Sequence, residues 1–183
     1  MRLTKIYTRT GDKGTTSLDG KIRLPKHAPV MDVVGGLDEL NSAIGVVIAH
    51  LHVKKISHKK MIETLTKIQH HLFDIGGELS QPKYQVISAE HVIFLEKMID
   101  DWNASLSPLK EFILPGGSLS ASTCHLARAI CRRVERHFFA LTDLQPVSPA
   151  ILSYMNRLSD VLFVAARVID KKSKIKTTYW KHM

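Results

Sequence analysis

Arginine side chains gather along one side of residues 118–141. At the helical spacing of about 100° per residue, Arg128, Arg132 and Arg136 span an arc of about 80°, and Glu135 lies just outside it. The apolar residues of the same segment lie on the opposite side. A planar guanidinium group binds phosphate or carboxylate through paired hydrogen bonds. The pattern therefore predicts an anion site, and the alternative is an ordinary solvated helix face.

A second candidate anion site lies near the N-terminus. The run Thr8-Arg9-Thr10-Gly11-Asp12-Lys13-Gly14-Thr15-Thr16-Ser17 combines glycines, hydroxyl groups and two cations. Glycines let backbone N–H groups approach an anion, and threonine hydroxyls add further donors. Lys13, Arg23 and Lys26 can supply positive charge to a polyphosphate. The run is not a Walker A motif, so it predicts either another kind of phosphate-binding loop or a plain β-turn.

Five helices are predicted to position these groups. Apolar residues recur at three- and four-residue spacing in residues 31–52, 58–79, 88–106, 118–141 and 148–169. Turn residues separate the segments, and Ser118 is a candidate N-cap for the fourth. Long helices joined by short loops pack as an antiparallel bundle. We therefore predict an all-α fold: a five-helix bundle over residues 30–170, a non-helical segment over 1–29 with a strand at Lys5–Thr8, and a basic tail over 171–183.

The composition fits a single globular domain over residues 1–183. Hydrophobic residues make up 44% of the chain, which suffices for a core at this length. The formal charge of +9 favours an acidic partner, which could be nucleic acid, an anionic membrane or a phosphorylated small molecule. No signal peptide is recognisable, and no apolar run reaches the ~20 residues of a membrane span. We expect a cytoplasmic protein that does not bind membranes. Cys124 and Cys131 would lie about 10 Å apart on one helix, too far for a disulfide.

Further motifs, taken together with these patterns, resemble those of a known protein family. They are GLDELNSAIG at residues 36–45, LFDIGGEL at 72–79, FILPGG at 112–117 with the arginine segment that follows it, and NRLSD at 156–160 with AAR at 165–167. Together with residues 8–16, they resemble the helical-bundle ATP:cob(I)alamin adenosyltransferases over residues 5–168. That family transfers the 5′-deoxyadenosyl group of ATP to the cobalt of a reduced corrinoid and releases triphosphate. The resemblance implies the same activity, with ATP as co-substrate, Mg²⁺ as its companion ion and cobalamin as substrate.

The resemblance assigns both anion motifs to ATP, so residues 1–29 become the expected nucleotide-binding segment. Arg132 is expected to stabilise the leaving triphosphate, and no protein ligand set for a metal is expected. One departure concerns His27-Ala28-Pro29-Val30, where the family usually has an acidic residue before the proline and an arginine after it. The residues expected to bind ATP are Thr8, Arg9, Thr10, Gly11, Thr16, Ser17, Lys26, Arg132, Arg133, Glu135, Arg136 and Asn156.

Three residues match the corrinoid side of the family. Phe112 stands where an aromatic ring displaces the lower axial ligand of cobalt, so Phe112 and Arg132 are the expected catalytic residues. Asp38 and Arg128 match an ion pair that closes the corrinoid site. The family assembles as a homotrimer with sites between neighbouring subunits. A corrinoid reductase or an acceptor mutase is a further expected partner.

Two alternatives stay open on the sequence. One is a protein of the same fold that carries corrinoid and ATP without turnover. The other is a basic helical protein that binds nucleic acid, although the chain has no aromatic stacking platform and no recognition-helix pattern. We therefore expect no nucleic-acid partner. The basic tail has no role on these grounds beyond solubility.

Overall fold

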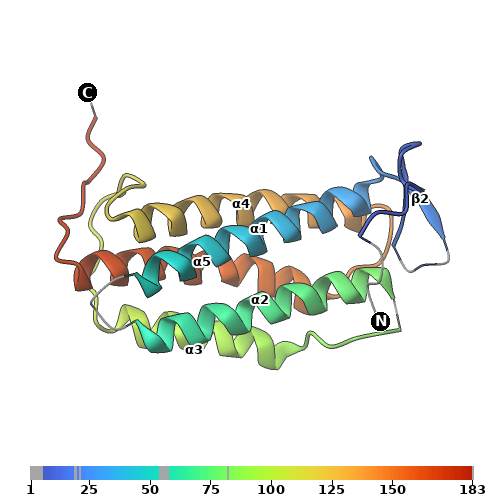
Figure 1. Ribbon diagram of the computed structural model, residues 1–183. Coiled ribbons are helices and arrows are strands. Elements are labelled where there is room, and N and C mark those ends of the chain that lie inside the picture. Colours follow the sequence, from blue (N-terminus) through green and yellow to red (C-terminus); the bar gives the residue numbers. More distant parts are fainter. Residues whose placement is uncertain (1–5, 19, 21, 54–57, 82, 183) are drawn as a thin grey trace.

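Five long helices make up most of the protein, which is described by a computed structural model (Figure 1). The structure describes residues 6–18, 20, 22–53, 58–81 and 83–182. Two short antiparallel strands, β1 (Thr15–Ser17) and β2 (Arg23–Pro25), precede the helices. The helices are α1 (Pro29–His52), α2 (Lys59–Ser80), α3 (Ala89–Asn103), α4 (Leu119–Thr142) and α5 (Pro149–Lys172). The predicted helical bundle is confirmed.

Local sequence explains where the helices begin. Pro29 and Pro149 occupy the first turns of α1 and α5, where a missing backbone N–H leaves no hydrogen bond unmade. Ser118 caps α4 as predicted, because its hydroxyl accepts a hydrogen bond from the Ala121 N–H at 3.3 Å. No helix of the described residues combines the length and hydrophobicity that a bilayer span requires.

Two predicted boundaries need correction. The third helix ends at Asn103 and not at residue 106, and the Ser105 hydroxyl donates a hydrogen bond to the Trp102 carbonyl in the turn that follows. The strand predicted over residues 5–8 is wrong for residues 6–8, which are irregular, and Lys5 lies outside the described residues. The strands lie further along the chain, where the Arg23 guanidinium bridges the hairpin by donating to Thr15. The sequence did not reveal these strands, because hydrogen bonds from one arginine side chain leave no alternating pattern of apolar residues.

Helix α4 packs closely against both α1 and α5. Helix α1 packs between α2 and α4, α4 packs between α1 and α5, and α3 covers α5 (Figure 1). The backbones of α1 and α4 approach closely at Gly36, where an added Cβ would lie only 2.7 Å from Cγ2 of Val134. Glycine is therefore needed at position 36 to bring the two helices together. Of the predicted apolar stripe of α4, Ala127, Val134, Phe138 and Leu141 are buried and Ile130 is half-buried.

A buried hydrogen bond joins α2 to α5 within this core. His71 Nδ1 and the Tyr154 hydroxyl lie 3.0 Å apart, and both side chains are buried. The edge of the His71 ring also contacts His91 on α3, with 4.7 Å between ring centroids. Burial lowers the pKa of His71 from 6.5 to about 4, with smaller contributions from His91 and Lys67 that outweigh the opposing effect of Asp74. The imidazole is therefore neutral at neutral pH.

We expect His71→Gln to make the fold less sensitive to mild acid. The pKa of His71 is lower in the folded chain, at about 4, than the usual 6.5, so the unfolded chain binds the proton first. Stability contributed by the neutral imidazole is present above pH 6.5 and is lost as the pH falls towards 4. Glutamine can keep a hydrogen bond to Tyr154 without titrating. Urea unfolding near pH 7 and near pH 5 should show that the wild type loses about 2 kcal/mol more than the variant. Equal losses would contradict the assignment.

Candidate active site

A hollow of about 1000 Å³ lies at the end of the bundle where the chain passes from α3 to α4. Aromatic rings from three parts of the chain line it: Phe112 from the loop before α4, Phe163 from α5 and Trp180 from the C-terminal tail. The Phe112 side chain is 81% exposed, so it contributes little to the core. A hollow lined by aromatic rings with a few polar groups is the usual form of a small-molecule site. This end of the bundle therefore has the features of a binding site for a large, partly apolar ligand.

The C-terminal tail holds the Phe112 segment in place. The Trp180 N–H donates a hydrogen bond to the Phe112 carbonyl at 2.8 Å, and Ile113 forms an antiparallel β-bridge with Tyr179. Tail and loop consequently run side by side at one end of the molecule (Figure 1). Sequence reasoning missed this role of the tail. The signal that could have revealed it is the Tyr179-Trp180 pair, two aromatic residues in an otherwise basic stretch.

The other end of the Phe112 segment is fastened to α5. Asp170 accepts a hydrogen bond from the Ser118 N–H at 2.9 Å, so its carboxylate satisfies a free donor at the start of α4. Gly117 has a φ of +97°, and a Cβ at this position would lie 1.8 Å from Oδ2 of Asp170. Both the backbone angle and the close carboxylate require glycine. The second glycine of the PGG sequence before α4 thus has a structural explanation.

A second hollow, of about 610 Å³, lies at the opposite end of the bundle. The hairpin contributes Thr16 and Lys26, α1 contributes Asp38, and α2 contributes Phe73 and Gly77 among the lining residues. A space between a Thr- and Lys-bearing hairpin and two helices suits an anionic ligand with an apolar part. Asp38 therefore lies with the hairpin residues, whereas Arg128 lines the Phe112 hollow.

Most of the other residues that were predicted to bind ATP at the hairpin end of the bundle lie in the loop before β1. Residues 8–10 and Ser17 are exposed, and the Thr8 and Thr10 hydroxyls lie 2.8 Å apart. Gly11 lies against the Lys26 side chain, since a Cβ at position 11 would be 3.4 Å from Nζ. The backbone forms a turn here, in which the Gly14 N–H donates a hydrogen bond to the Gly11 carbonyl at 3.2 Å. The hydroxyls and the lysine predicted to act together are thus held in one hairpin.

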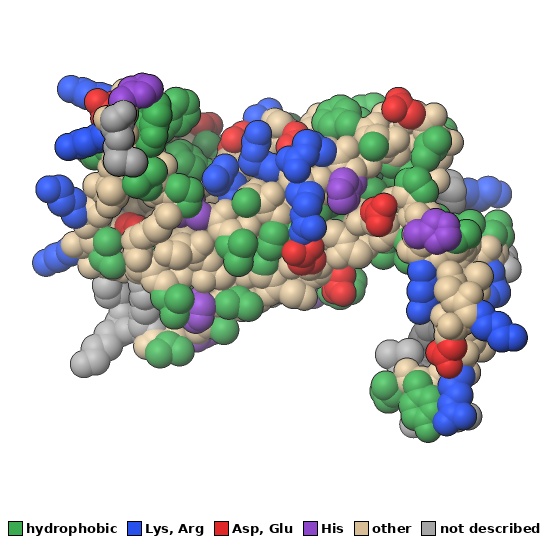
Figure 2. Space-filling model, turned by 90° about the horizontal axis from the view of Figure 1, so that it is seen from above, with side chains coloured by type: hydrophobic (Ala, Val, Ile, Leu, Met, Phe, Trp, Pro, Cys, Tyr) green, Lys and Arg blue, Asp and Glu red, His purple; other side chains and the backbone are tan. Residues whose placement is uncertain are grey.

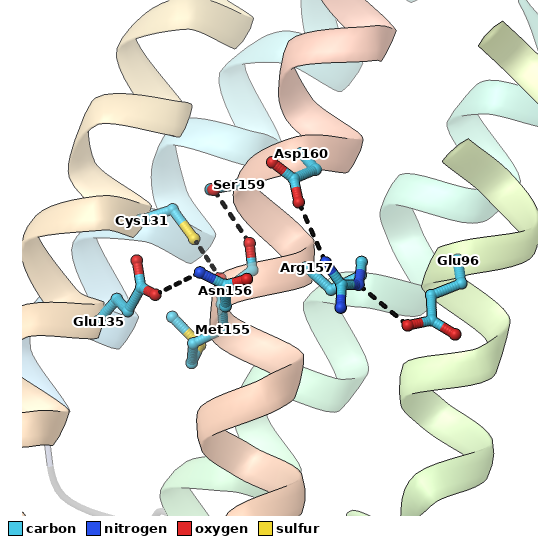
Figure 3. A network of polar contacts seen from close by, with 8 residues as sticks. All are labelled: Glu96, Cys131, Glu135, Met155, Asn156, Arg157, Ser159 and Asp160. Carbon is cyan, nitrogen blue, oxygen red and sulfur yellow. Dashed lines mark hydrogen bonds and ion pairs between the residues drawn. The ribbon is translucent and has the colours of Figure 1, made fainter. Parts of the chain in front are cut away.

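Glu135 and Asn156 meet across the α4–α5 interface (Figure 3). The Asn156 amide donates a hydrogen bond to Oε1 of Glu135 at 2.7 Å, and the Cys131 thiol donates to the Met155 carbonyl at 3.3 Å one turn away. Burial raises the pKa of the Cys131 thiol, so the group stays protonated and unreactive. Two residues that were predicted to bind ATP, one from the fourth helix and one from the fifth, therefore lie in contact in the structure.

The arginines of α4 lie beside this pair on the same outer face. Arg133 forms an ion pair with Glu39 of α1, and Arg136 donates to the Arg132 carbonyl at 3.1 Å. Arg132, Arg133 and Arg136 are all exposed. Figure 2 shows Lys and Arg side chains grouped over the middle of the bundle, with further groups at the tail end and on the hairpin. The predicted phosphate-binding arginines are thus available to a ligand.

The two anion motifs lie on different sides of α1. The hairpin hollow is bounded by α1 and α2, whereas the arginine face extends from α1 across α4 to α5. Arg128 is half-buried, and its Nε has no hydrogen-bond partner. Among the described residues, no ion pair joins Arg128 to Asp38. One chain therefore does not bring together all the residues that were predicted to act at one site.

Protein ligands for a resident metal ion are not grouped in the part of the chain that the structure describes. No three His, Cys, Asp or Glu side chains of those residues come close enough to hold a metal. Burial and the nearby Arg128 lower the pKa of His125, which is thereby kept neutral beneath the Phe163 ring.

Comparison with known proteins identifies the family. The family model for cobalamin adenosyltransferases matches residues 6–169. The chain belongs to the cobalamin adenosyltransferase family. It is 42% identical to a cobalamin adenosyltransferase of Cupriavidus metallidurans over 98% of this chain and 96% of that protein. It is 45% identical to a corrinoid adenosyltransferase of Bacillus subtilis, over 93% of this chain and 89% of that protein.

Solved structures of the same family share the fold. The F112A variant of a PduO-type ATP:corrinoid adenosyltransferase from Lactobacillus reuteri, complexed with cobalamin and ATP, superposes with a TM-score of 0.88. It is 33% identical in sequence and covers 97% of this chain and 100% of that chain. The R132K variant, complexed with ATP, gives a TM-score of 0.87 at 33% identity over 96% of this chain and 100% of that chain. The predicted family and the predicted fold are both confirmed.

We expect Gly117→Ala to loosen the fastening of the Phe112 segment. An alanine Cβ would collide with the Asp170 carboxylate and would force an L side chain into a left-handed backbone conformation. Unfolding in urea should show a loss of about 2 kcal/mol or more. Gly116→Ala is the matched control, because a Cβ there meets nothing within 4 Å. Equal stability of the two variants would show that the close contact does not matter.

Proposed function

We propose that this chain transfers the 5′-deoxyadenosyl group of ATP to the cobalt of a reduced corrinoid, at sites shared by neighbouring subunits of a homotrimer. The observation that carries the proposal is the exposed Phe112 ring beside a hollow of about 1000 Å³, in a chain that belongs to the adenosyltransferase family. The relatives complexed with cobalamin and ATP support both substrates. A reductase of the cell must supply the corrinoid in its reduced state.

The chemistry requires no nucleophile from the protein. Cobalt in the +1 state supplies the electron pair that attacks C5′ of ATP, the new cobalt–carbon bond forms, and the C5′–O bond breaks. The triphosphate leaves with that electron pair. The protein contributes position and charge: it aligns cobalt with C5′ and stabilises the negative charge that grows on the leaving oxygen. The absence of a catalytic triad among the described residues is consistent with such a division of work.

The nucleotide site is composed of two parts. The hairpin of one subunit supplies the residue 8–11 loop, Thr16, Ser17 and Lys26, and the neighbouring subunit supplies its α4–α5 face. Arg132 stabilises the departing triphosphate, with Arg133 and Arg136 beside it. The separation of the two parts by α1 within one chain supports this arrangement, because a rotationally related copy can present its α4 to the hairpin.

The Glu135–Asn156 pair serves this site from the interface of α4 and α5. The hydrogen bond at 2.7 Å fixes the orientation of both side chains and leaves the second oxygen of Glu135 and the amide oxygen of Asn156 as acceptors. Such oxygens fit Mg²⁺, which binds one or two protein oxygens and takes its other ligands from phosphate and water. When bound, Mg²⁺ neutralises part of the triphosphate charge.

Phe112 and Arg128 serve the corrinoid. The Phe112 ring has no lone pair and excludes water from the lower face of the corrin, so the cobalt loses its axial ligand and is easier to reduce. Trp180 and Phe163 extend this apolar wall. Arg128 pairs with Asp38 of the neighbouring subunit and closes the site. Support comes from the unpartnered Nε of Arg128 and the exposed carboxylate of Asp38 within one chain.

Anaerobic incubation with ATP, Mg²⁺ and chemically reduced cobalamin tests the activity. We expect alkylcobalamin to appear in the corrin spectrum with one triphosphate per turnover. Arg132→Ala should lower kcat by roughly 100-fold or more, because one transition-state donor contributes about 3 kcal/mol. The kcat of Arg132→Lys should lie between those of the wild type and Arg132→Ala, because lysine keeps the positive charge but cannot form the paired hydrogen bonds of a guanidinium group. The exposed Arg132 side chain has little part in packing, so unfolding should be unchanged.

Two outcomes of that experiment would contradict the proposal. Binding of ATP and cobalamin without product would indicate a carrier of the same fold. Salt-sensitive DNA binding with no affinity for nucleotide would indicate a nucleic-acid-binding protein. Near-normal turnover by Arg132→Ala would leave the activity standing and remove the assigned role of that arginine.

We expect Phe112→Ala to impair the reduction of cobalt more than the binding of ATP. Without the ring, water or the lower base can remain on the cobalt, so the fraction of four-coordinate cob(II)alamin on the enzyme should fall several-fold. Electron paramagnetic resonance and absorbance spectra of the bound cob(II)alamin measure that fraction. Ile93→Ala on α3 is a control of the same kind, since Ile93 is 60% exposed and lies outside the hollow. An unchanged fraction for Phe112→Ala would contradict its role.

A further inference from the structure

The rim of the Phe112 hollow is basic. Lys110, Lys181 and His182 line it and are exposed, and Arg128 of α4 lines it and is half-buried. Glu111 is the single acidic residue among its described lining residues. Residues 171–183 contain five lysines and no acidic residue, so the tail brings positive charge to this rim. The proposed adenosyl transfer gives no role to Lys110, Lys181 or His182.

The pairing between tail and loop determines where the cations lie. The backbone N–H of Trp180 donates a hydrogen bond to the Phe112 carbonyl at 2.8 Å, so the segment that carries Lys181 is held beside the segment that carries Lys110. Lys110, Lys181 and His182 line the same hollow as the Phe112 and Trp180 rings. The His182 ring packs against Trp180, with 4.1 Å between the ring centroids.

An apolar floor with a cationic rim fits a ligand that has a broad apolar body and an anionic group at its edge. The amide side chains of a corrin are neutral and do not need such cations. Complete cobalamin also carries one phosphodiester, in the nucleotide loop that links the corrin to the lower base. Once Phe112 displaces that base from cobalt, the loop must leave the lower face and lie near the rim. Cobinamide, a corrinoid without this loop, has no such anion.

We propose that Lys110 and Lys181 bind the phosphodiester of the displaced nucleotide loop, and that the chain consequently prefers complete cobalamin to cobinamide. The inference rests on the proposed function of the Phe112 hollow. Both lysines are exposed, flexible point charges, so they can follow a mobile phosphate without a fixed paired geometry. His182, held by its contact with Trp180, lines the same side of the rim.

The test measures binding without turnover. Anaerobic titration with cob(II)alamin, cob(II)inamide and cob(II)inamide phosphate, with no ATP present, yields a Kd for each from quenching of tryptophan fluorescence. All three have the same corrin and the same cobalt oxidation state. The wild type should bind cob(II)alamin and cob(II)inamide phosphate about 10-fold more tightly than cob(II)inamide at low salt. The ratio should approach one at high salt, because exposed charges are screened.

The variants Lys110→Met and Lys181→Met should each remove part of this preference, and the double variant should remove nearly all of it while the Kd for cob(II)inamide stays constant. Lys176→Met is the matched control: it removes the same charge from the same tail, but Lys176 lines a different cavity. Equal wild-type affinity for cob(II)alamin and cob(II)inamide would overturn the proposal. Weak binding of cob(II)inamide phosphate would overturn it too, because the base and ribose would then be responsible. Failure of every corrinoid to bind would instead refute the proposed function.

Discussion

The close contact of α1 and α4 at Gly36 determines how the rest of the molecule can work. Because a Cβ at this position would lie 2.7 Å from Val134, only glycine lets the two helices pack at this distance. The hairpin then lies on the α2 side of α1, and the arginines lie on the α4–α5 side. Two groups of residues suited to one polyphosphate are thereby kept apart within a chain. A second copy of the chain is the simplest way to unite them.

A similar logic applies to the corrinoid end of the bundle. An exposed phenylalanine contributes little to stability, so its segment must be held by other contacts. Those contacts are the tail, through the Trp180–Phe112 hydrogen bond, and α5, through the Asp170 carboxylate at Ser118. These contacts hold the segment without involving the Phe112 ring, so the ring is free to contact a ligand. Preorganisation of this kind lets binding energy act on the cobalt instead of on ordering the loop.

Much of this could be predicted from the sequence, because helix periodicity, the Ser118 cap and the separating prolines are local signals. The hydrogen bond between Glu135 and Asn156 was not predicted, although the family resemblance had assigned both residues to the ATP site. The role of the tail was not predicted, because a β-bridge between residues 113 and 179 is a long-range contact without local pattern. Strands β1 and β2 were not predicted, because each has only three residues and no alternating apolar pattern; backbone pairing and the Arg23 side chain join them.

The central claim is that each nucleotide site contains the hairpin of one subunit and the α4 arginines of its neighbour. It is tested most directly by mixing two inactive variants, Lys26→Ala and Arg132→Ala, by co-expression. A shared site predicts that randomly assembled trimers recover about a quarter of the wild-type activity, since about one site in three of every mixed trimer combines an intact hairpin with an intact arginine face. No recovery, with mixed assemblies present and each variant folded, would show that hairpin and arginines act within one chain and would contradict the account.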